Sequence, residues 1–339
     1  MNYLNAALPA DHDQSKSKSD IAGISVIVIP FPALGDLTIY LRLGWLFHQA
    51  GAKVTFYSDV LLPVQDYFDW LDVMPERGND LTRLAAEFDL VVACFEKSYR
   101  MEAWRSEYAT HENIAIVTAK KISKDSGLDG RAVTVKGHRF PGASRAFCLD
   151  SRSGKTMVDW VDHYASQVFG LQTDAAQDWF TIPNAIRNSQ LVLIFPTTPE
   201  QKKNYWIRGF GLLAKSLQRR GWQVEFVCVP KEHAVVQQAL SGFTVNSFPN
   251  LKALIDHVAT ASVVISNDSG GGHLASMLGL ITFTITRRRK NFVWRPGFNA
   301  KNTVIYPIFR FKWLNKKYVW QPFVPVWRIA TQLGKRADS

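Results

Sequence analysis

Apolar and polar positions in the first half of the chain follow strand and helix periods in turn. Residues 24–29 form a β-branched run, which is typical of a strand buried on both faces. A turn over residues 30–35, a helical pattern over residues 36–50 that Gly51 ends, and an apolar run over residues 54–57 follow. This order is that of a βαβ unit, so the first half is expected to contain a parallel sheet. Similar apolar runs predict further strands over residues 90–95 and 114–119.

A second alternating series begins after Pro183. It predicts strands over residues 191–195, 224–229, 263–266 and 282–286. It predicts helices over residues 205–220, 233–240, 251–260 and 323–334, and one more helix that follows a glycine-rich turn after the third strand and ends at residue 278. Residues 120–155 show weak periodicity and give no assignment. Two consecutive series predict an α/β protein of two Rossmann-like domains, with parallel sheets facing a cleft. The expected boundaries are a loose leader over residues 1–20, domains over 21–182 and 183–315, and a tail over 316–339.

The composition excludes several classes of protein. The chain has 339 residues, of which 47% are hydrophobic and 20% charged, which is enough apolar material for packed cores and argues against a disordered or fibrous chain. The three cysteines, Cys94, Cys148 and Cys228, are far apart and form no CxxC pair. A disulfide scaffold and a cysteine-rich zinc site are therefore not expected, and a reducing compartment is favoured.

The net charge of +11 is concentrated at one end of the chain. Residues 287–339 hold 13 Lys and Arg against one acidic residue, and 11 of the chain's 42 aromatic residues. One interpretation is an anionic partner, either a membrane surface, an anionic glycolipid or a nucleic acid. The other is a solvated basic face over ordinary core aromatics.

No segment is predicted to span a membrane. The apolar stretch over residues 21–35 has only 15 residues and contains Pro30 and Pro32, whereas a spanning helix needs roughly 20 apolar residues. With the separated cysteines, this favours a cytoplasmic protein, with peripheral contact to the cytoplasmic face of the inner membrane as an option.

The first segment that could carry chemistry is the turn over residues 30–36, between the first strand and the first helix. Ligands of open α/β sheets bind beyond the carboxyl ends of strands, so this turn is expected at the ligand site. Gly35 allows a tight turn, and Asp36 stands near the helix N-terminus, where the helix dipole keeps a carboxylate ionised. Such a carboxylate is either a helix cap or a general base.

The second segment covers residues 266–273, with the sequence SNDSGGGH, again between a strand and a helix. Its consecutive glycines leave backbone N–H groups open to an anion at a helix N-terminus, which indicates a phosphate site. No Gly-Lys-Ser/Thr follows, so it is not a Walker A loop, and Ser269 lacks the surroundings of a nucleophile elbow. His273 is either a donor to a phosphate or an ordinary helix residue.

The third segment covers residues 197–206, with the sequence TTPEQKKNYW. Its hydroxyl and ammonium groups at the carboxyl end of a strand suit a diphosphate or a sugar. The alternative is an ordinary polar loop.

Together these segments resemble glycosyltransferase family nine, the heptosyltransferases of lipopolysaccharide core assembly, in order and in spacing. The matching motifs are the GD loop at Gly35 and Asp36, the Thr-Thr pair at Thr197 and Thr198 with Lys202, and the Asp-Ser-Gly-x-x-His loop that starts at Asp268. The resemblance spans residues 24–298, and the last motif is the most specific.

The resemblance implies a GT-B fold, with the acceptor on the first domain and a nucleotide-sugar donor on the second. It implies an inverting, metal-independent transfer of a sugar, with heptose from ADP-heptose as the first choice, to a lipopolysaccharide-core or related glycan, and no cofactor. Asp36 then becomes the general base, and the tail helix is expected to pack back on the first domain. The implied donor-binding residues are Thr197, Thr198, Lys202, Glu232, Asp268, Ser269, Gly270, Gly271 and His273.

Two other classes of function stay open at this point. A degenerate transferase fold would bind a glycan or a partner without turnover. A nucleic-acid-binding protein is suggested only by the basic tail, and the chain has no recognised nucleic-acid motif.

Overall fold

The computed structural model describes most of the chain. The described residues are 21–78, 81–101, 108, 110–119, 121–122, 126–173, 179–180, 182, 185–288, 290–312 and 318–337. The leader expected over residues 1–20 lies outside them. No helix among these residues combines the length and the apolar character needed to cross a bilayer.

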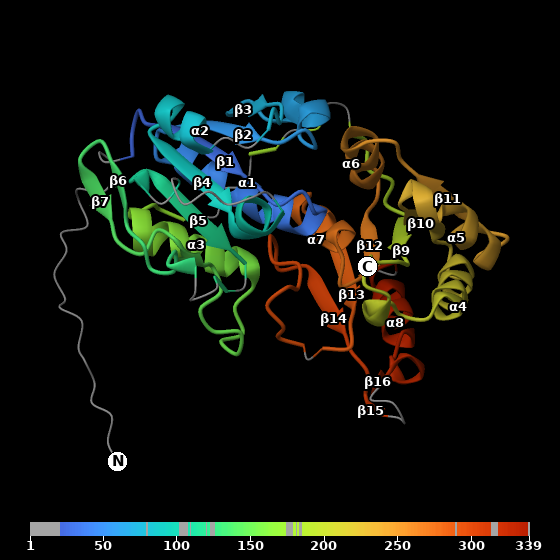
Figure 1. Ribbon diagram of the computed structural model, residues 1–339. Coiled ribbons are helices and arrows are strands. Elements are labelled where there is room, and N and C mark those ends of the chain that lie inside the picture. The colour runs from blue at the N-terminus through green and yellow to red at the C-terminus, as the bar shows by residue number, and fades with distance from the viewer. Residues whose placement is uncertain are drawn as a thin grey trace, which may run out of the picture.

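The first half of the chain folds around a six-stranded parallel sheet (Figure 1). The strand order is β3-β2-β1-β4-β5-β8. The strands are β1 (Ser25–Ile29), β2 (Lys53–Tyr57), β3 (Leu71–Met74), β4 (Leu90–Cys94), β5 (Ile114–Thr118) and β8 (Arg145–Ala146). The expected parallel sheet is therefore confirmed. Residues 120–155, which had no assignment, contain β8 and a small hairpin of β6 (Val133–Val135) and β7 (His138–Phe140).

Helices cover both faces of this sheet. They are α1 (Leu34–Gln49), α2 (Leu81–Glu87) and α3 (Met157–Phe169), with shorter turns η1 (Leu62–Tyr67) and η2 (Glu96–Met101). The start of α3 is fixed by a capping box, in which the Thr156 hydroxyl accepts from the Asp159 N–H and the Asp159 carboxylate accepts from the Thr156 N–H. Gly170 ends the helix in the left-handed conformation, with φ of 65°.

The second half repeats the same arrangement. Its parallel sheet has the order β11-β10-β9-β12-β13-β14. The strands are β9 (Leu191–Phe195), β10 (Gln223–Cys228), β11 (Thr244–Ser247), β12 (Val263–Asn267), β13 (Ile281–Ile285) and β14 (Asn302–Ile305). The helices and turns are η5 (Gln201–Lys203), α4 (Ile207–Gln218), η6 (Pro230–Glu232), α5 (His233–Ala239), α6 (Leu251–Ala259), α7 (Gly270–Met277), η8 (Gln321–Phe323) and α8 (Trp327–Ala337). Each predicted strand and helix of this half is present within a few residues.

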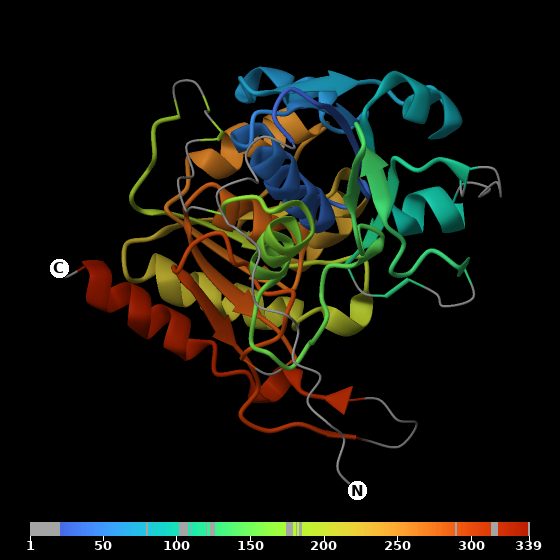
Figure 2. The same cartoon turned by 90° about the vertical axis from the view of Figure 1, so that its left-hand side faces the viewer.

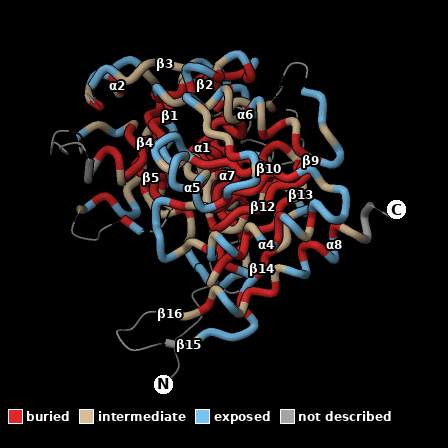
Figure 3. The backbone as a smooth tube through the Cα atoms, turned by 90° about the vertical axis from the view of Figure 1, so that its right-hand side faces the viewer, coloured by how far each residue is buried: buried red, intermediate tan, exposed pale blue. Residues whose placement is uncertain are grey.

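The two halves share one apolar core. A cluster of buried side chains runs from the first sheet through α1 and α3 into α6, α7 and one face of the second sheet. Helices α1 and α7 lie side by side at the centre of the molecule, and both are buried along most of their length (Figures 1 and 3). The amino ends of these two helices therefore meet where the halves join.

The tail differs from the expectation in one respect. Helix α8 was expected to pack back on the first domain, but it packs on α4 of the second half. Its side chains Ile329, Ala330 and Leu333 are buried in the core of the second half, together with Trp320 and Val324. The apolar face of α8 joins the same buried cluster as α4, α5 and one face of the second sheet. Of the expected tail over residues 316–339, residues 316, 317, 338 and 339 lie outside the described part.

Candidate functional site

The carboxyl ends of the strands in the second sheet bring the predicted donor-binding residues together. Thr197 follows β9, Glu232 lies in η6 after β10, and Asp268 follows β12. The Thr197 hydroxyl donates a hydrogen bond of 2.7 Å to a carboxylate oxygen of Glu232. Two motifs that are 35 residues apart in the sequence thus form one polar wall.

A buried asparagine, which the sequence patterns did not single out, ties two of these loops together. The Asn267 amide group accepts from the Tyr205 N–H at 2.8 Å and donates to the Pro196 carbonyl at 2.8 Å. Asn267 is fully buried, so losing either bond would leave a polar group without a partner. Asn267 therefore fixes the distance between the loop after β9 and the loop after β12.

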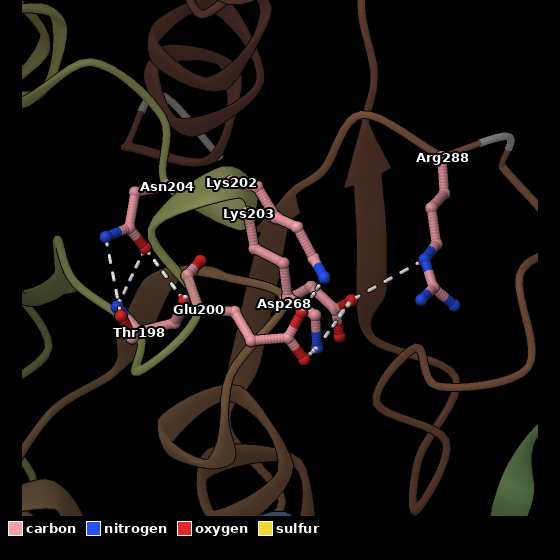
Figure 4. A network of polar contacts seen from close by, with 7 residues as sticks. All are labelled: Thr198, Glu200, Lys202, Lys203, Asn204, Asp268 and Arg288. Carbon is pink, nitrogen blue, oxygen red and sulfur yellow. Dashed lines mark hydrogen bonds and ion pairs between the residues drawn. The ribbon is translucent and has the colours of Figure 1, made fainter. Parts of the chain in front are cut away.

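Thr198 shapes its own loop. Its backbone N–H and its hydroxyl each lie 2.8 Å from the side-chain oxygen of Asn204, and the hydroxyl lies 3.0 Å from the Glu200 carbonyl (Figure 4). Because Thr198 is buried and its hydroxyl is engaged, the geometry gives it a supporting position, while Thr197 faces Glu232.

The structure brings a neighbour of the predicted lysine to the Asp268 loop. Lys202 is 66% exposed and its ammonium group pairs with Glu200 at 3.0 Å. Lys203 is 24% exposed and lies 3.3 Å from Glu200 and 3.7 Å from Asp268. Arg288, which follows β13, approaches Asp268 from the other side at 3.9 Å (Figure 4). Lys203 and Arg288 are candidate anion-binding residues that the sequence patterns did not single out.

Burial and charge act in opposite directions on the carboxylates of this network. Burial raises the pKa of Asp268, and the nearby Lys203 and Arg288 partly offset that rise. The hydrogen bond from Lys202, with the charge of Lys203, lowers the pKa of Glu200. A carboxylate accepts hydrogen bonds and repels phosphate, so Asp268 is suited to hold the two cations or to accept from sugar hydroxyls.

The Asp268 loop ends in α7, whose first residues are all small. A Cβ atom on Gly270 would lie 2.7 Å from Leu34 Cβ, and one on Gly271 would lie 2.5 Å from the Phe195 ring. One on Gly272 would lie 2.6 Å from the Ser266 hydroxyl. The glycine run therefore permits α7 to pack directly on α1 and β9, a reason for it that the sequence did not reveal.

The residue before this run carries an unused hydroxyl. Ser269 is the N-cap residue of α7 but makes no capping hydrogen bond. Its hydroxyl is buried and has no hydrogen-bond partner within the described part of the chain. A buried hydroxyl beside the free N–H groups of a helix N-terminus is suited to bind an anionic oxygen.

His273 lies between the two halves. Burial lowers its pKa to about 4, so the imidazole is neutral near pH 7. A Cβ atom on Gly35 would lie 3.3 Å from the His273 ring, and the ring packs edge-on against Trp294 with centroids 5.7 Å apart. His273 is therefore a packed contact between α7 and the GD loop, and it can offer a phosphate at most a neutral N–H.

Asp36 lies in the first turn of α1, two residues after the helix begins. The N-cap residue is Ala33, which has no side-chain cap, so Asp36 is not the N-cap residue and lies at the third position of the helix. Asp36 is half-buried, and the contact of Gly35 with His273 places it at the junction with α7.

A second carboxylate lies in the same region of the first half. Burial, followed by the charges of Cys94, Glu96 and Asp36, raises the pKa of the buried Tyr40 well above its ordinary value. Glu96 accepts a 2.6 Å hydrogen bond from the Thr118 hydroxyl and a 3.3 Å one from the Cys94 thiol. Glu96 is thus part of the polar surroundings of Tyr40, and no sequence motif had marked it.

Comparison with known proteins gives one family match and several similar structures. Residues 151–306 match the family model "Glycosyltransferase family 9 (heptosyltransferase)". No curated protein matches the chain. Among solved structures, E. coli ADP-heptose lipopolysaccharide heptosyltransferase II is similar over 93% of this chain and 100% of its own, with 14% identity and a TM-score of 0.64.

Two further structures are similar with slightly lower TM-scores. E. coli heptosyltransferase WaaC, solved with ADP, is similar over 92% of this chain and 99% of its own, with 13% identity and a TM-score of 0.62. A family 9 glycosyltransferase from Veillonella parvula is similar over 85% and 87%, with 16% identity and a TM-score of 0.62. The chain has the GT-B fold. The resemblance to glycosyltransferase family nine is also confirmed.

Proposed function

We propose that the protein is an inverting glycosyltransferase that moves heptose from ADP-heptose to a lipopolysaccharide-core or related glycan acceptor. The observation that carries the proposal is the junction of α1 and α7. There a carboxylate on a helix N-terminus of one half meets a phosphate-type loop at a helix N-terminus of the other. The family match and the similar heptosyltransferase solved with ADP support a nucleotide-sugar donor.

The donor is proposed to bind on the second half. Thr197, Glu232 and the Asp268 loop stand along one sheet edge, and Glu232, one of the donor-binding residues that the resemblance implies, is proposed to contact the nucleoside. The diphosphate would lie against the α7 N-terminus and the Ser269 hydroxyl, with Lys202, Lys203 and Arg288 supplying charge. These groups stabilise the negative charge that develops on the leaving diphosphate.

The reaction is proposed to use Asp36 as the general base. Asp36 takes the proton of the acceptor hydroxyl as the hydroxyl oxygen attacks the anomeric carbon from the face opposite the diphosphate. The new glycosidic bond forms while the bond to the diphosphate breaks, and the nucleoside diphosphate leaves with the electron pair. Attack from the opposite face inverts the anomeric configuration. That the transfer needs no metal ion stays a prediction. Transfer activity that persists in the presence of a metal chelator would support it.

The acceptor is proposed to be a glycolipid or oligosaccharide that enters from the first half. A membrane-linked acceptor would require contact with the cytoplasmic face of the inner membrane, and the basic tail would supply it.

The test is a transfer assay with a panel of nucleotide sugars, including ADP-heptose, in the presence and absence of extracted core glycolipid. Mass spectrometry identifies bound donors and products, and NMR of the product reports the anomeric configuration. Transfer from ADP-heptose with inversion is expected. Donor binding without any transfer or hydrolysis would favour the non-catalytic alternative, and retention of configuration would contradict the mechanism.

A further inference from the structure

The segment between β14 and β15 (Phe311–Lys312) exposes large apolar side chains. Ile308 is 65% exposed and Phe309 is 58% exposed. The segment is nevertheless fixed, because the Ile308 N–H donates a 3.0 Å hydrogen bond to the Phe323 carbonyl. The Phe309 ring packs edge-on against the Phe323 ring with centroids 5.6 Å apart. Contacts with Phe323 thus fix the backbone of this segment while the Ile308 and Phe309 side chains remain exposed to solvent.

An arginine-lined pocket adjoins this segment. It has a volume of about 250 Å³ and is lined by Arg287, Arg288, Arg310 and Trp320. The Arg310 guanidinium donates a 2.9 Å hydrogen bond to the Arg287 carbonyl, which keeps these arginines together. Within the described part of the chain, only Arg288 of the three has a carboxylate within 4 Å, namely Asp268. Arg287 and Arg310 therefore carry positive charge that no acidic side chain described here neutralises.

The position of this surface suits contact with a flat partner. The segment lies beside the hairpin of β15 and β16 (Tyr318–Val319), which stands out from one end of the second half (Figures 1 and 2). We refer to Ile308, Phe309, Arg310 and Arg287 together as the docking surface.

We propose that the docking surface binds a bilayer of anionic phospholipid, with Ile308 and Phe309 entering the interface and Arg287 and Arg310 contacting headgroup phosphates. Arginine binds phosphate through paired N–H groups, and aromatic and aliphatic side chains beside cations are typical of peripheral membrane surfaces. The role in presenting a lipid-linked acceptor rests on the proposed function, but the binding itself does not.

Charge distinguishes this partner from the other candidates. A free phosphate would use the arginines but would leave Ile308 and Phe309 in water. In a dimer formed through this surface, two tails would face each other. Each tail holds 13 basic residues and one acidic residue over residues 287–339, so the two would repel each other. An anionic bilayer matches both the charge and the apolar side chains.

The experiment is cosedimentation of the full-length protein with vesicles of phosphatidylglycerol and phosphatidylcholine, without nucleotide sugar. Binding is expected at low ionic strength and not to pure phosphatidylcholine. It should weaken strongly in about 1 M salt, where the Debye length falls to about 3 Å. Arg310→Gln should weaken partitioning about fivefold, and Phe309→Ser or Ile308→Ser about tenfold.

Matched controls come from the same half of the molecule. Leu212 on α4 is 65% exposed, the same fraction as Ile308, and Arg219 is an exposed arginine at the end of that helix. Leu212→Ser and Arg219→Gln should leave partitioning unchanged. The proposal is overturned if the wild type ignores phosphatidylglycerol vesicles at low salt, or if the control variants lose as much binding as the docking-surface variants.

Two further measurements separate this inference from other outcomes. Sedimentation velocity shows whether Phe309→Ser changes the oligomeric state; a change there with unaltered vesicle binding would assign the surface to self-association and reject the membrane. Calorimetric titration with ADP should give equal affinity in the wild type and Phe309→Ser. If the transferase proposal is wrong, the wild type should fail to bind ADP in this titration, while its binding to vesicles would be unaffected.

Discussion

The two halves have the same strand order, yet the segments that follow two corresponding strands, β4 in the first half and β12 in the second, differ in their side chains. In the second half, β12 is followed by Asp268, Ser269 and three glycines, so the N-terminus of α7 lies beside charged side chains. In the first half, β4 is followed by Phe95, Glu96 and Lys97, and Phe95 and Lys97 are buried. Lys97 pairs with Glu76 at 2.6 Å, which neutralises it. The same topology thus places a candidate anion site after β12 in the second half and a buried lysine paired with a glutamate after β4 in the first half.

This difference divides the proposed work between the halves. The second half presents cations, hydroxyls and backbone N–H groups, which suit a nucleoside diphosphate. The first half contributes a carboxylate from the turn after β1, a different position in the sheet. Function on a shared fold therefore depends on which loop carries which side chain, and the predictions below test that division.

The largest effect is expected for Asp36→Asn. This change keeps the shape of the side chain and removes its basicity, so turnover should fall by about 10²–10⁴-fold. Steady-state transfer assays measure it, with Asp129→Asn, an exposed carboxylate of the same half, as the control. A turnover number within a few-fold of the wild type would show that the first half does not supply the base.

The next effect concerns His273, which packs against the first half. Its folded pKa of about 4 lies below the ordinary 6.5, so the unfolded chain binds a proton that the folded one does not. The free energy of unfolding should therefore fall as the pH drops from about 6.5 to about 4, by about 3 kcal/mol from this residue.

His273→Gln removes this contribution, so its unfolding free energy should depend less steeply on pH in that range. Urea denaturation at several pH values measures the slope. Equal slopes for the wild type and the variant would mean that His273 titrates normally and is not buried at the junction.

A smaller effect is expected when the contact between α1 and α7 is crowded. Valine at position 270 would place a Cβ atom 2.7 Å from Leu34 Cβ, so Gly270→Val should destabilise the protein by about 1–3 kcal/mol and reduce transfer. The control is Gly334→Ala in α8, where a Cβ atom would meet nothing within 4 Å. Thermal unfolding compares the two, and equal melting temperatures would disprove the close packing of the halves.

The smallest effect distinguishes two adjacent lysines. Lys203 lies near Asp268, whereas Lys202 forms an ion pair with Glu200 alone within the part of the chain that the structure describes. Lys203→Gln should therefore weaken ADP binding about tenfold and Lys202→Gln by less, since charge-assisted bonds contribute about 1.5–3 kcal/mol. Calorimetry measures both affinities. A larger loss of ADP affinity in Lys202→Gln would show that Lys202, the lysine of the family motif, binds the diphosphate instead of Lys203.

Much of the fold could be predicted because buried parallel strands read as apolar runs. The run at residues 191–195 coincides with β9, and the turns that follow β1 and β12 lie at strand ends, where Asp36 and Asp268 were expected. The short strands were not predicted, since β8 has two residues and too little pattern to detect.

The missed features depend on contacts between distant residues. Neighbouring residues of a 3₁₀ turn point in different directions, so the sequence could not show which lysine of η5 reaches Asp268. The apolar face of α8 could have packed on either half, because amphipathicity gives a buried face but not its partner. Arg288 belongs to a run of basic residues, and only the path of the chain after β13 brings it to Asp268.

The most direct test of the division between the halves is calorimetric titration of ADP into the wild type, Asp36→Asn and Lys203→Gln. Asp36→Asn should bind ADP with the affinity of the wild type, because its half does not hold the diphosphate, while Lys203→Gln should bind about tenfold more weakly. A loss of ADP affinity in Asp36→Asn as large as that in Lys203→Gln would contradict the assignment of donor and base to separate halves.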